Sequence, residues 1–242
     1  MLFSMKYKNL TVIGTSHIAK QSLDDVEKTV IELKPDIICL ELDKRRLYAL
    51  LSDQKGDKVN LRDIMRIGLK GYLFSIIGAY VEKKLGQQVG IKPGSEMLKA
   101  IELAKKNNIK IAVIDQDIEK TLKRFSQEFS WKERFRLVMD IIKAFIFRKS
   151  EIDFDLRTVP SKSVVDKLVK KVKDRYPGVY KVLIEERNDF MASKLVRIMY
   201  SNDEKKILAI VGAGHEEEMI NLIKKKKVEV VHKGIYRKIG LD

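Results

Sequence analysis

Short apolar runs alternate with segments of helical spacing along most of this chain. The apolar runs span residues 10–13, 36–42, 109–114, 207–211 and 228–232. Uninterrupted runs of this length are typical of strands buried on both faces of a parallel sheet. Residues with helical spacing lie between the runs, at 22–33, 95–106, 179–200 and 216–227. The pattern predicts an α/β fold, with a central largely parallel sheet flanked by helices.

Two longer amphipathic stretches, around residues 61–92 and 118–149, stand apart from this alternation. The second contains an apolar stripe formed by Trp131, Phe135, Val138, Ile142 and Phe145. We expect a single domain over residues 1–242, in which both stretches are helical insertions. Because two amphipathic regions exceed what one small sheet must cover, we also expect a homodimer.

The chain is strongly basic. It has 49 lysines and arginines against 34 acidic residues, which gives a formal net charge of +15. Such a charge favours nucleic acid or an anionic membrane surface as a partner, although lysine-rich surfaces also suit heat-adapted proteins. No basic stretch is interleaved with aromatic residues, and the chain has one tryptophan. We therefore expect no binding to nucleic acid and retain a membrane surface as an alternative partner.

The sequence favours a cytoplasmic location. Strand-like residues begin almost at the amino terminus and leave no room for a signal peptide. The longest apolar stretch, residues 71–81, is shorter than the roughly 20 residues that span a bilayer. The one cysteine, Cys39, cannot form an internal disulfide, and its apolar neighbours predict a buried and inert thiol.

Two segments place a histidine where a buried strand leaves the sheet. They are Gly14-Thr-Ser-His17 and Gly212-Ala-Gly-His215. Glycine at such an exit permits unusual backbone angles and the close approach of other groups. Acidic pairs follow the two remaining parallel strands, at Glu41 with Asp43 and at Asp115 with Asp117. Since parallel strands share one carboxyl edge, we expect all these groups to face one crevice.

Two imidazoles and a carboxylate are suitable ligands for a divalent metal. We expect His17, His215 and Glu41 to bind manganese, cobalt, zinc or iron. A metal-bound water would support hydrolysis near neutral pH. A salt bridge from Glu41 to Arg45 or Arg46, one turn along the next helix, is the alternative.

The helix expected at 179–200 carries Glu185-Glu186-Arg187-Asn188. Such a polar run is usually a solvated face, but Phe190, Met191 and Leu195 indicate that the helix also has an inward side. An inward arginine could stabilise an oxyanion or bind a carboxylate. His232 lies in a short apolar run without a glycine exit, which favours a structural role.

These motifs, in this order, resemble the TraB/PrgY family of pheromone-shutdown proteins, which is related to the GumN and Tiki proteins. The resemblance rests on Gly-Thr-Ser-His17, Glu41-Leu-Asp with Arg45 and Arg46, Gly94-Ser-Glu96, Asp115-Gln-Asp117, Glu186-Arg187-Asn188 with Met191, and Gly-Ala-Gly-His215. It covers nearly the whole chain. It implies a fold of the erythromycin-esterase and ChaN type and a metal-dependent peptidase activity.

Carried over residue by residue, the resemblance implies His17, His215 and Glu41 as the metal site and Glu186 with Arg187 as a further pair. We expect Glu41, as ligand or general base, and Arg187 and Glu186 to be catalytic. We expect the substrate to contact Arg45, Asp115, Asp117 and Asn188. The sequence departs from the family pattern at Gln116, where arginine is expected between the two aspartates. Many family members continue into carboxyl-terminal membrane helices, so we expect membrane association if the natural chain extends further.

Three functions remain in competition. The first is a metal-dependent hydrolase of peptides. The second is a non-catalytic protein that sequesters a peptide or small ligand in the same crevice. The third is a protein whose basic, amphipathic surface docks to a membrane or to RNA, and its binding would weaken steeply with salt.

Overall fold

The computed structural model describes residues 4–16, 20–52, 94–147 and 161–226. Its strands are β1 (Ser4–Tyr7), β2 (Leu10–Thr15), β3 (Ile37–Leu40), β4 (Lys110–Val113) and β5 (Ile207–Gly212). They form one sheet in the order β1-β2-β5-β3-β4, in which β2, β5, β3 and β4 are parallel and β1 pairs antiparallel with β2. The α/β fold predicted from the sequence is confirmed. The edge strand β1 was not predicted.

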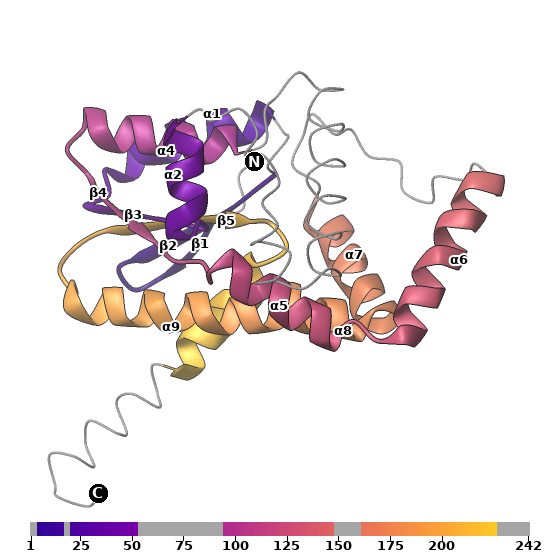
Figure 1. Cartoon of the computed structure of the whole chain (residues 1–242). Coiled ribbons are helices and arrows are strands. Elements are labelled where there is room, and N and C mark those ends of the chain that lie inside the picture. The colour runs from indigo at the N-terminus through magenta and orange to yellow at the C-terminus, as the bar shows by residue number, and fades with distance from the viewer. Residues whose placement is uncertain (1–3, 17–19, 53–93, 148–160, 227–242) are drawn as a thin grey trace, which may run out of the picture.

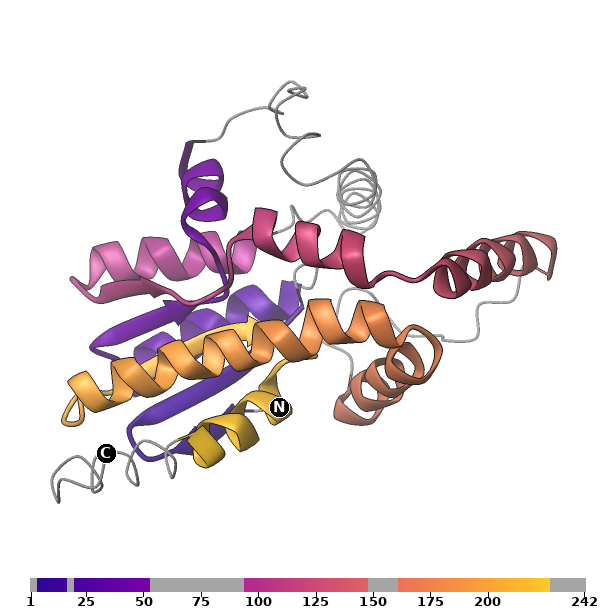
Figure 2. The same cartoon turned by 60° about the horizontal axis from the view of Figure 1, so that its bottom comes forward.

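Helices cover both faces of the sheet. Figure 1 shows α1 (Lys20–Leu33) and α4 (Ser95–Lys106) on one face and α9 (Glu186–Ser201) on the other. A helix over residues 216–226 also covers the second face, and Figure 2 shows it beside α9. The short α2 (Lys44–Ser52) follows β3 on the side of α1 and α4. This three-layer arrangement buries both faces of the parallel strands, as their continuous apolar runs require.

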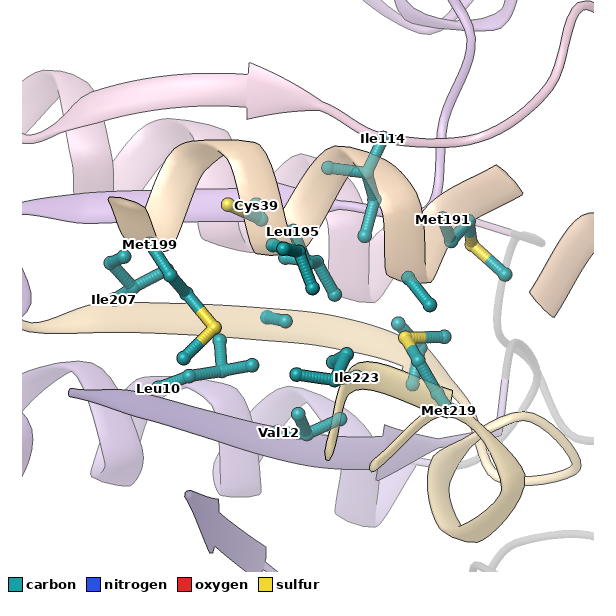
Figure 3. Close-up of a cluster of buried hydrophobic side chains, with 14 of the residues drawn as sticks. Leu10, Val12, Cys39, Ile114, Met191, Leu195, Met199, Ile207, Met219 and Ile223 are labelled. Atoms are coloured by element: carbon teal, nitrogen blue, oxygen red, sulfur yellow. The ribbon is translucent and has the colours of Figure 1, made fainter. Parts of the chain in front are cut away.

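The core on the α9 face is drawn in part in Figure 3. Leu195 and Met199 of α9 lie over Leu10 of β2 and Ile207 of β5, and all four are fully or almost fully buried. Helix 216–226 adds its own apolar side chains to this cluster: Met219, Ile220 and Ile223. Burial of a side chain of this size contributes about 1.5–3 kcal/mol, so this layer holds the helices that carry the candidate site.

The register of the sheet brings the ends of its four parallel strands to one edge. Thr15, the last residue of β2, lies opposite Gly212, the last residue of β5. On the other side of β5, the Glu41 amide just beyond β3 donates to the carbonyl of Ile210 over 3.1 Å. The Asp115 amide beyond β4 donates to the Leu42 carbonyl over 3.2 Å. The carboxyl ends therefore converge as the topology predicts.

The stretch expected to be helical from 118 to 149 is two helices. They are α5 (Ile118–Glu128) and α6 (Trp131–Phe147), separated at Ser130. Ser130 and Glu133 form a reciprocal capping box: the Ser130 hydroxyl accepts from the Glu133 amide over 3.3 Å, and the Glu133 carboxylate accepts from the Ser130 amide over 2.9 Å. This Ser-x-x-Glu spacing starts a new helix inside an amphipathic run.

A π-helical turn, η1 (Lys181–Glu185), interrupts the long helix expected at 179–200. The helix begins earlier, with α8 (Pro177–Tyr180), because proline is favoured in the first turn of a helix. The helix α7 (Lys162–Arg175) precedes it. The insertion around 61–92 and the strand expected at 228–232 lie outside the described residues. In the part of the chain that the structure describes, no helix has the length and apolar content needed to cross a bilayer.

Cys39 is fully buried within β3, as predicted. Burial raises the pKa of its thiol to about 12, so the reactive thiolate is scarce at neutral pH. We expect native protein to react with a thiol-disulfide reagent near pH 8 far more slowly than protein unfolded in guanidinium. Absorbance of the released chromophore measures both rates. Similar rates in the two samples would show that the thiol is accessible in the native fold.

Candidate functional site

A buried carboxylate, Glu41, stands at the carboxyl end of β3. Its side chain is 3% exposed. The amide of Gly212 at the end of β5 donates to Oε2 over 2.6 Å, and Arg187 Nη2 forms an ion pair with Oε1. The backbone of one strand and a cation from α9 therefore share this carboxylate. Arg45 and Arg46, its alternative partners, pair with Glu119 and Asp115 respectively.

Arg187 is the cation at the centre of the cluster. Its Nε donates to Asp115 Oδ1 over 3.0 Å and its Nη2 to Asp115 Oδ2 over 2.8 Å, a two-point pairing that fixes the guanidinium plane. Burial alone would favour the neutral guanidine, but the carboxylates of Glu41 and Asp115 outweigh it and raise the pKa of Arg187 above its ordinary value. Arg187 is therefore a permanent positive charge at the sheet edge.

His215 is buried beside this ion pair, and its neighbours determine which ring nitrogen carries the proton. Glu218 accepts from Asn188 Nδ2 over 3.0 Å, so the other amide atom, Oδ1, faces His215 Nδ1 at 2.6 Å. Nδ1 must then donate. On the far side of the ring, Arg187 Nη1 lies 3.3 Å from Nε2 and can only donate, so Nε2 accepts. The contacts assign the neutral tautomer with hydrogen on Nδ1.

Glu218, which accepts from Asn188, also links the surroundings of His215 to α8. The Tyr180 hydroxyl donates to the same oxygen of Glu218 over 3.1 Å that accepts from Asn188. Between Tyr180 and Asn188 lies the π turn η1, and the carbonyl of Leu183 within it accepts from Arg187 Nη1 over 3.2 Å. The extra residue of a π turn shifts the face that the following helix presents, and such turns are frequent at functional sites.

Several predicted site residues lie away from this cluster. Glu186 pairs with Arg124 of α5, at 2.6 Å between Oε1 and Nη2. Asp117 caps α5 by accepting from the Glu119 amide over 2.9 Å. Arg45 is half exposed beside them. The structure therefore unites Glu41, Asp115, Arg187, Asn188 and His215, and leaves Glu186, Asp117 and Arg45 on its margins. His17 lies outside the described residues.

A groove of about 610 Å³ adjoins the cluster. It runs between α5, α9 and helix 216–226, and Glu218 and Gln116 connect it to the buried residues. Its lining mixes both charges with a few apolar side chains: Gln116, Lys120, Arg124, Glu185, Glu186, Asp189, Phe190, Ser193, Glu218 and Leu222. Glu186 and Arg124 thus belong to the wall of a groove.

Glu216 is a buried carboxyl group near the site that no sequence motif indicated. Its carboxyl group packs against Gly14, where a Cβ atom would lie 2.6 Å from Glu216 Oε2 and 3.1 Å from Ala213 Cα. Glycine at position 14 is thus favoured by close approach and not by its backbone angles, because Gly94 is the only glycine with positive φ among the described residues. Burial raises the pKa of Glu216 to about 7. No sequence motif indicated Glu218 or Tyr180 either, although Glu218 lies one helical turn beyond His215.

Two of the three predicted metal ligands are suitably placed. Glu41 Oε1 and His215 Nε2 are 3.4 Å apart. Bonds of about 2.0–2.1 Å in a tetrahedral site separate two ligand atoms by about 3.3 Å. Within residues 4–16, 20–52, 94–147 and 161–226, no group of three or more histidine, cysteine or acidic side chains could hold a metal ion. A complete site therefore needs a ligand from outside these residues, such as His17.

The ion pair at Arg187 makes a prediction about stability. Arg187→Met leaves Glu41 buried without its cation and leaves Asp115 paired with the more exposed Arg46, and we expect the free energy of unfolding to fall by about 3–5 kcal/mol. Arg124→Met, which removes an arginine from a partly exposed pair with Glu186, should cost under about 1 kcal/mol. Urea unfolding followed by circular dichroism measures both. Equal losses would contradict a special role for the buried pair.

The hydrogen bonds around His215 predict its tautomer. In nitrogen-15 NMR at about pH 8, above the ordinary histidine pKa, we expect the His215 proton on Nδ1. The signal is assigned by its loss in His215→Gln. Asn188→Leu removes the acceptor for Nδ1 and should abolish this preference, whereas Asn202→Leu, far from the ring, should leave it unchanged. A proton found on Nε2 in the unaltered protein would overturn the assignment.

Comparison with known proteins identifies the family of this chain. An uncharacterized protein of Methanocaldococcus jannaschii is 36% identical over 219 residues, which cover 90% of this chain and 54% of that protein. TraB domain-containing proteins of Mus musculus and Homo sapiens are each 23% identical over 227 residues, covering 84% of this chain and 60% of each relative. The chain thus spans between half and two thirds of the length of these relatives. Residues 2–232 match the TraB/PrgY/gumN family, and the chain belongs to that family.

Proposed function

We propose that this protein is a metal-dependent hydrolase of peptides, with Glu41, His215 and His17 as metal ligands. The main support is the 3.4 Å separation of Glu41 Oε1 and His215 Nε2, because it suits two ligands of one ion. They follow β3 and β5, and β2, which ends two residues before His17, is the other neighbour of β5. Three adjacent strands therefore lead to the three ligands.

The surrounding residues prepare both described ligands. Asn188 holds the His215 proton on Nδ1, so the lone pair of Nε2 points toward Glu41. The Gly212 amide donates to Glu41 Oε2, so Oε1, which pairs with Arg187 in this structure, would be the ligand atom. A divalent metal held there would supply an activated water and polarise the scissile carbonyl. Such supporting hydrogen bonds typically change metal affinity by about 10–100-fold.

Arg187 would interact with the substrate rather than with the metal. Its two hydrogen bonds to Asp115 hold the guanidinium even if its contact with Glu41 is given up. One nitrogen, Nη1, lies 3.3 Å from His215 Nε2, so the positive charge is next to the proposed metal ligands. A fixed cation there can stabilise the developing oxyanion of an amide or bind a substrate carboxylate.

The adjoining groove supports a peptide as the substrate. Its volume of about 610 Å³ falls within the usual range for ligand sites. Both charges line its wall, with Lys120 and Arg124 opposite the acidic residues of α9, and Phe190 and Leu222 add apolar surface. An extended chain of mixed polarity suits such a surface better than a uniform apolar ligand does.

One observation favours a second function, the sequestering of a peptide without hydrolysis. Arg187 forms an ion pair with Glu41 and also contacts His215 Nε2, so a guanidinium already occupies both described ligands. If that arrangement persists in solution, the cluster would bind a carboxylate-bearing ligand through Arg187 and take up no metal.

Metal content separates the two functions. We expect protein purified without chelators to hold close to one equivalent of manganese, cobalt, zinc or iron by mass spectrometry. The variant His17→Ala with His215→Ala should lose the metal, and His232→Ala is the matched histidine control that should retain it. Asn188→Ala should weaken metal affinity by about 10–100-fold, because it removes the support of His215.

Turnover completes the test. Metal-loaded protein should cleave members of a peptide library, and the double histidine variant should not, while circular dichroism shows that both are folded. An unaltered protein that holds no metal, even after reloading with each ion, would overturn the hydrolase. Peptide binding without cleavage in that protein would then favour sequestration.

A further inference from the structure

A row of large apolar side chains on α6 faces solvent. Trp131, Phe135, Val138 and Ile142 are 77%, 70%, 53% and 44% exposed. Their spacing of four, three and four residues places them on one face of the helix. The sequence predicts an apolar stripe here, and in the structure the sheet does not cover it. Contiguous exposed apolar surface on a helix indicates an interaction site.

The acidic residues of α6 point away from this stripe. Glu133 is buried and accepts from the Gly178 amide over 2.7 Å, which attaches α6 to α8. Asp140 pairs with Arg175 and accepts from the Tyr176 hydroxyl at the end of α7. Both carboxylates are therefore committed to the inner side of the helix and fix its orientation.

Three of the four cations of α6 lie at the borders of the stripe, and the fourth, Arg136, donates to the carbonyl of Arg175. Lys132 and Lys143 are exposed. On the other border, Arg134 lies over the Trp131 ring, with its guanidinium carbon 4.8 Å from the ring centroid. Figures 1 and 2 both place α6 at the periphery, farther from the sheet than α5 or α8. The helix thus presents an apolar face with basic borders to the outside.

This distribution of charge favours an anionic surface over a second copy of the chain. Two copies that pair through this stripe would bring basic borders together, with no free acidic side chain from either α6 to offset them. An interfacial membrane helix has the opposite requirement, because its basic residues meet lipid phosphates while aromatic and aliphatic residues enter the headgroup region. The net charge of +15 adds a general attraction to such a surface.

We propose that α6 is a docking helix for an anionic phospholipid membrane, with Trp131, Phe135, Val138 and Ile142 inserted into the interface. Lys132, Arg134 and Lys143 contact the lipid phosphates. The contact is peripheral and independent of the proposed hydrolase, because it uses none of the residues around Arg187.

Trp131 is the only tryptophan of the chain, so its fluorescence reports directly on the stripe. We expect a blue shift of emission and protection from acrylamide when the full chain meets vesicles of phosphatidylcholine with about one third phosphatidylglycerol. Phosphatidylcholine vesicles alone should have little effect, and added salt should reverse the change. Flotation of the same vesicles measures the bound fraction.

Matched variants test the apolar and the basic parts separately. Phe135→Ser should weaken binding at least about tenfold, whereas Tyr48→Ser, which alters an equally exposed aromatic on α2 (71% against 70%), should have little effect. Lys132→Glu with Lys143→Glu should lower affinity on the order of tenfold or more. Lys167→Glu with Lys170→Glu makes the same change of net charge on exposed positions of α7 and should cost much less.

Three results would overturn the proposal. If the emission of Trp131 shifts with protein concentration in the absence of vesicles, and the mass measured by light scattering doubles with it, a second copy covers the stripe. If Trp131 of the monomer is already protected from acrylamide, the chain covers the stripe itself. Equal binding to vesicles with and without phosphatidylglycerol would contradict the role of the lysines.

Discussion

The two buried carboxylates at the ends of β3 and β4 share one buried cation, Arg187, which lies between them. Glu41 and Asp115 are each nearly inaccessible, and their negative charges would be costly at the sheet edge without a cation. Arg187 comes from α9, which is far along the chain and packs on the sheet through Met191, Leu195 and Met199. Packing of this helix and ionisation of the site therefore depend on one another.

The hydrogen bonding of the His215 ring depends in turn on helix 216–226. Glu218 of that helix orients the Asn188 amide, and the amide determines which nitrogen of His215 carries the proton. Met219 and Ile223 anchor the same helix in the core. The hydrogen bonding of a histidine at the candidate site thus depends on Glu218, a side chain that also lines the neighbouring groove.

At α6, hydrogen bonds and ion pairs again attach a helix to its neighbours, but here the apolar face of the helix is exposed. Here the capping box at Ser130 and the pairs of Glu133 and Asp140 use the polar side chains to attach the helix to its neighbours. Since those contacts occupy the inner side, the apolar stripe turns outward. An amphipathic pattern in a sequence shows that a helix has two faces, but it does not show which one is buried within the same molecule.

The sequence by itself determined the parallel sheet, its strand ends and the convergence of Glu41, Asp115 and His215, because burial on both faces requires continuous apolar runs and parallel strands share an edge. It also indicated that Arg187 could face inward. The break at Ser130 was readable in principle from its Ser-x-x-Glu spacing. Only the tertiary structure decided that Arg187 bridges two carboxylates, that Glu186 turns to Arg124, and that Glu218 orients Asn188. These contacts join side chains from elements that are distant in sequence. Their geometry depends on how the helices pack and on the π turn η1, which no local sequence pattern predicts.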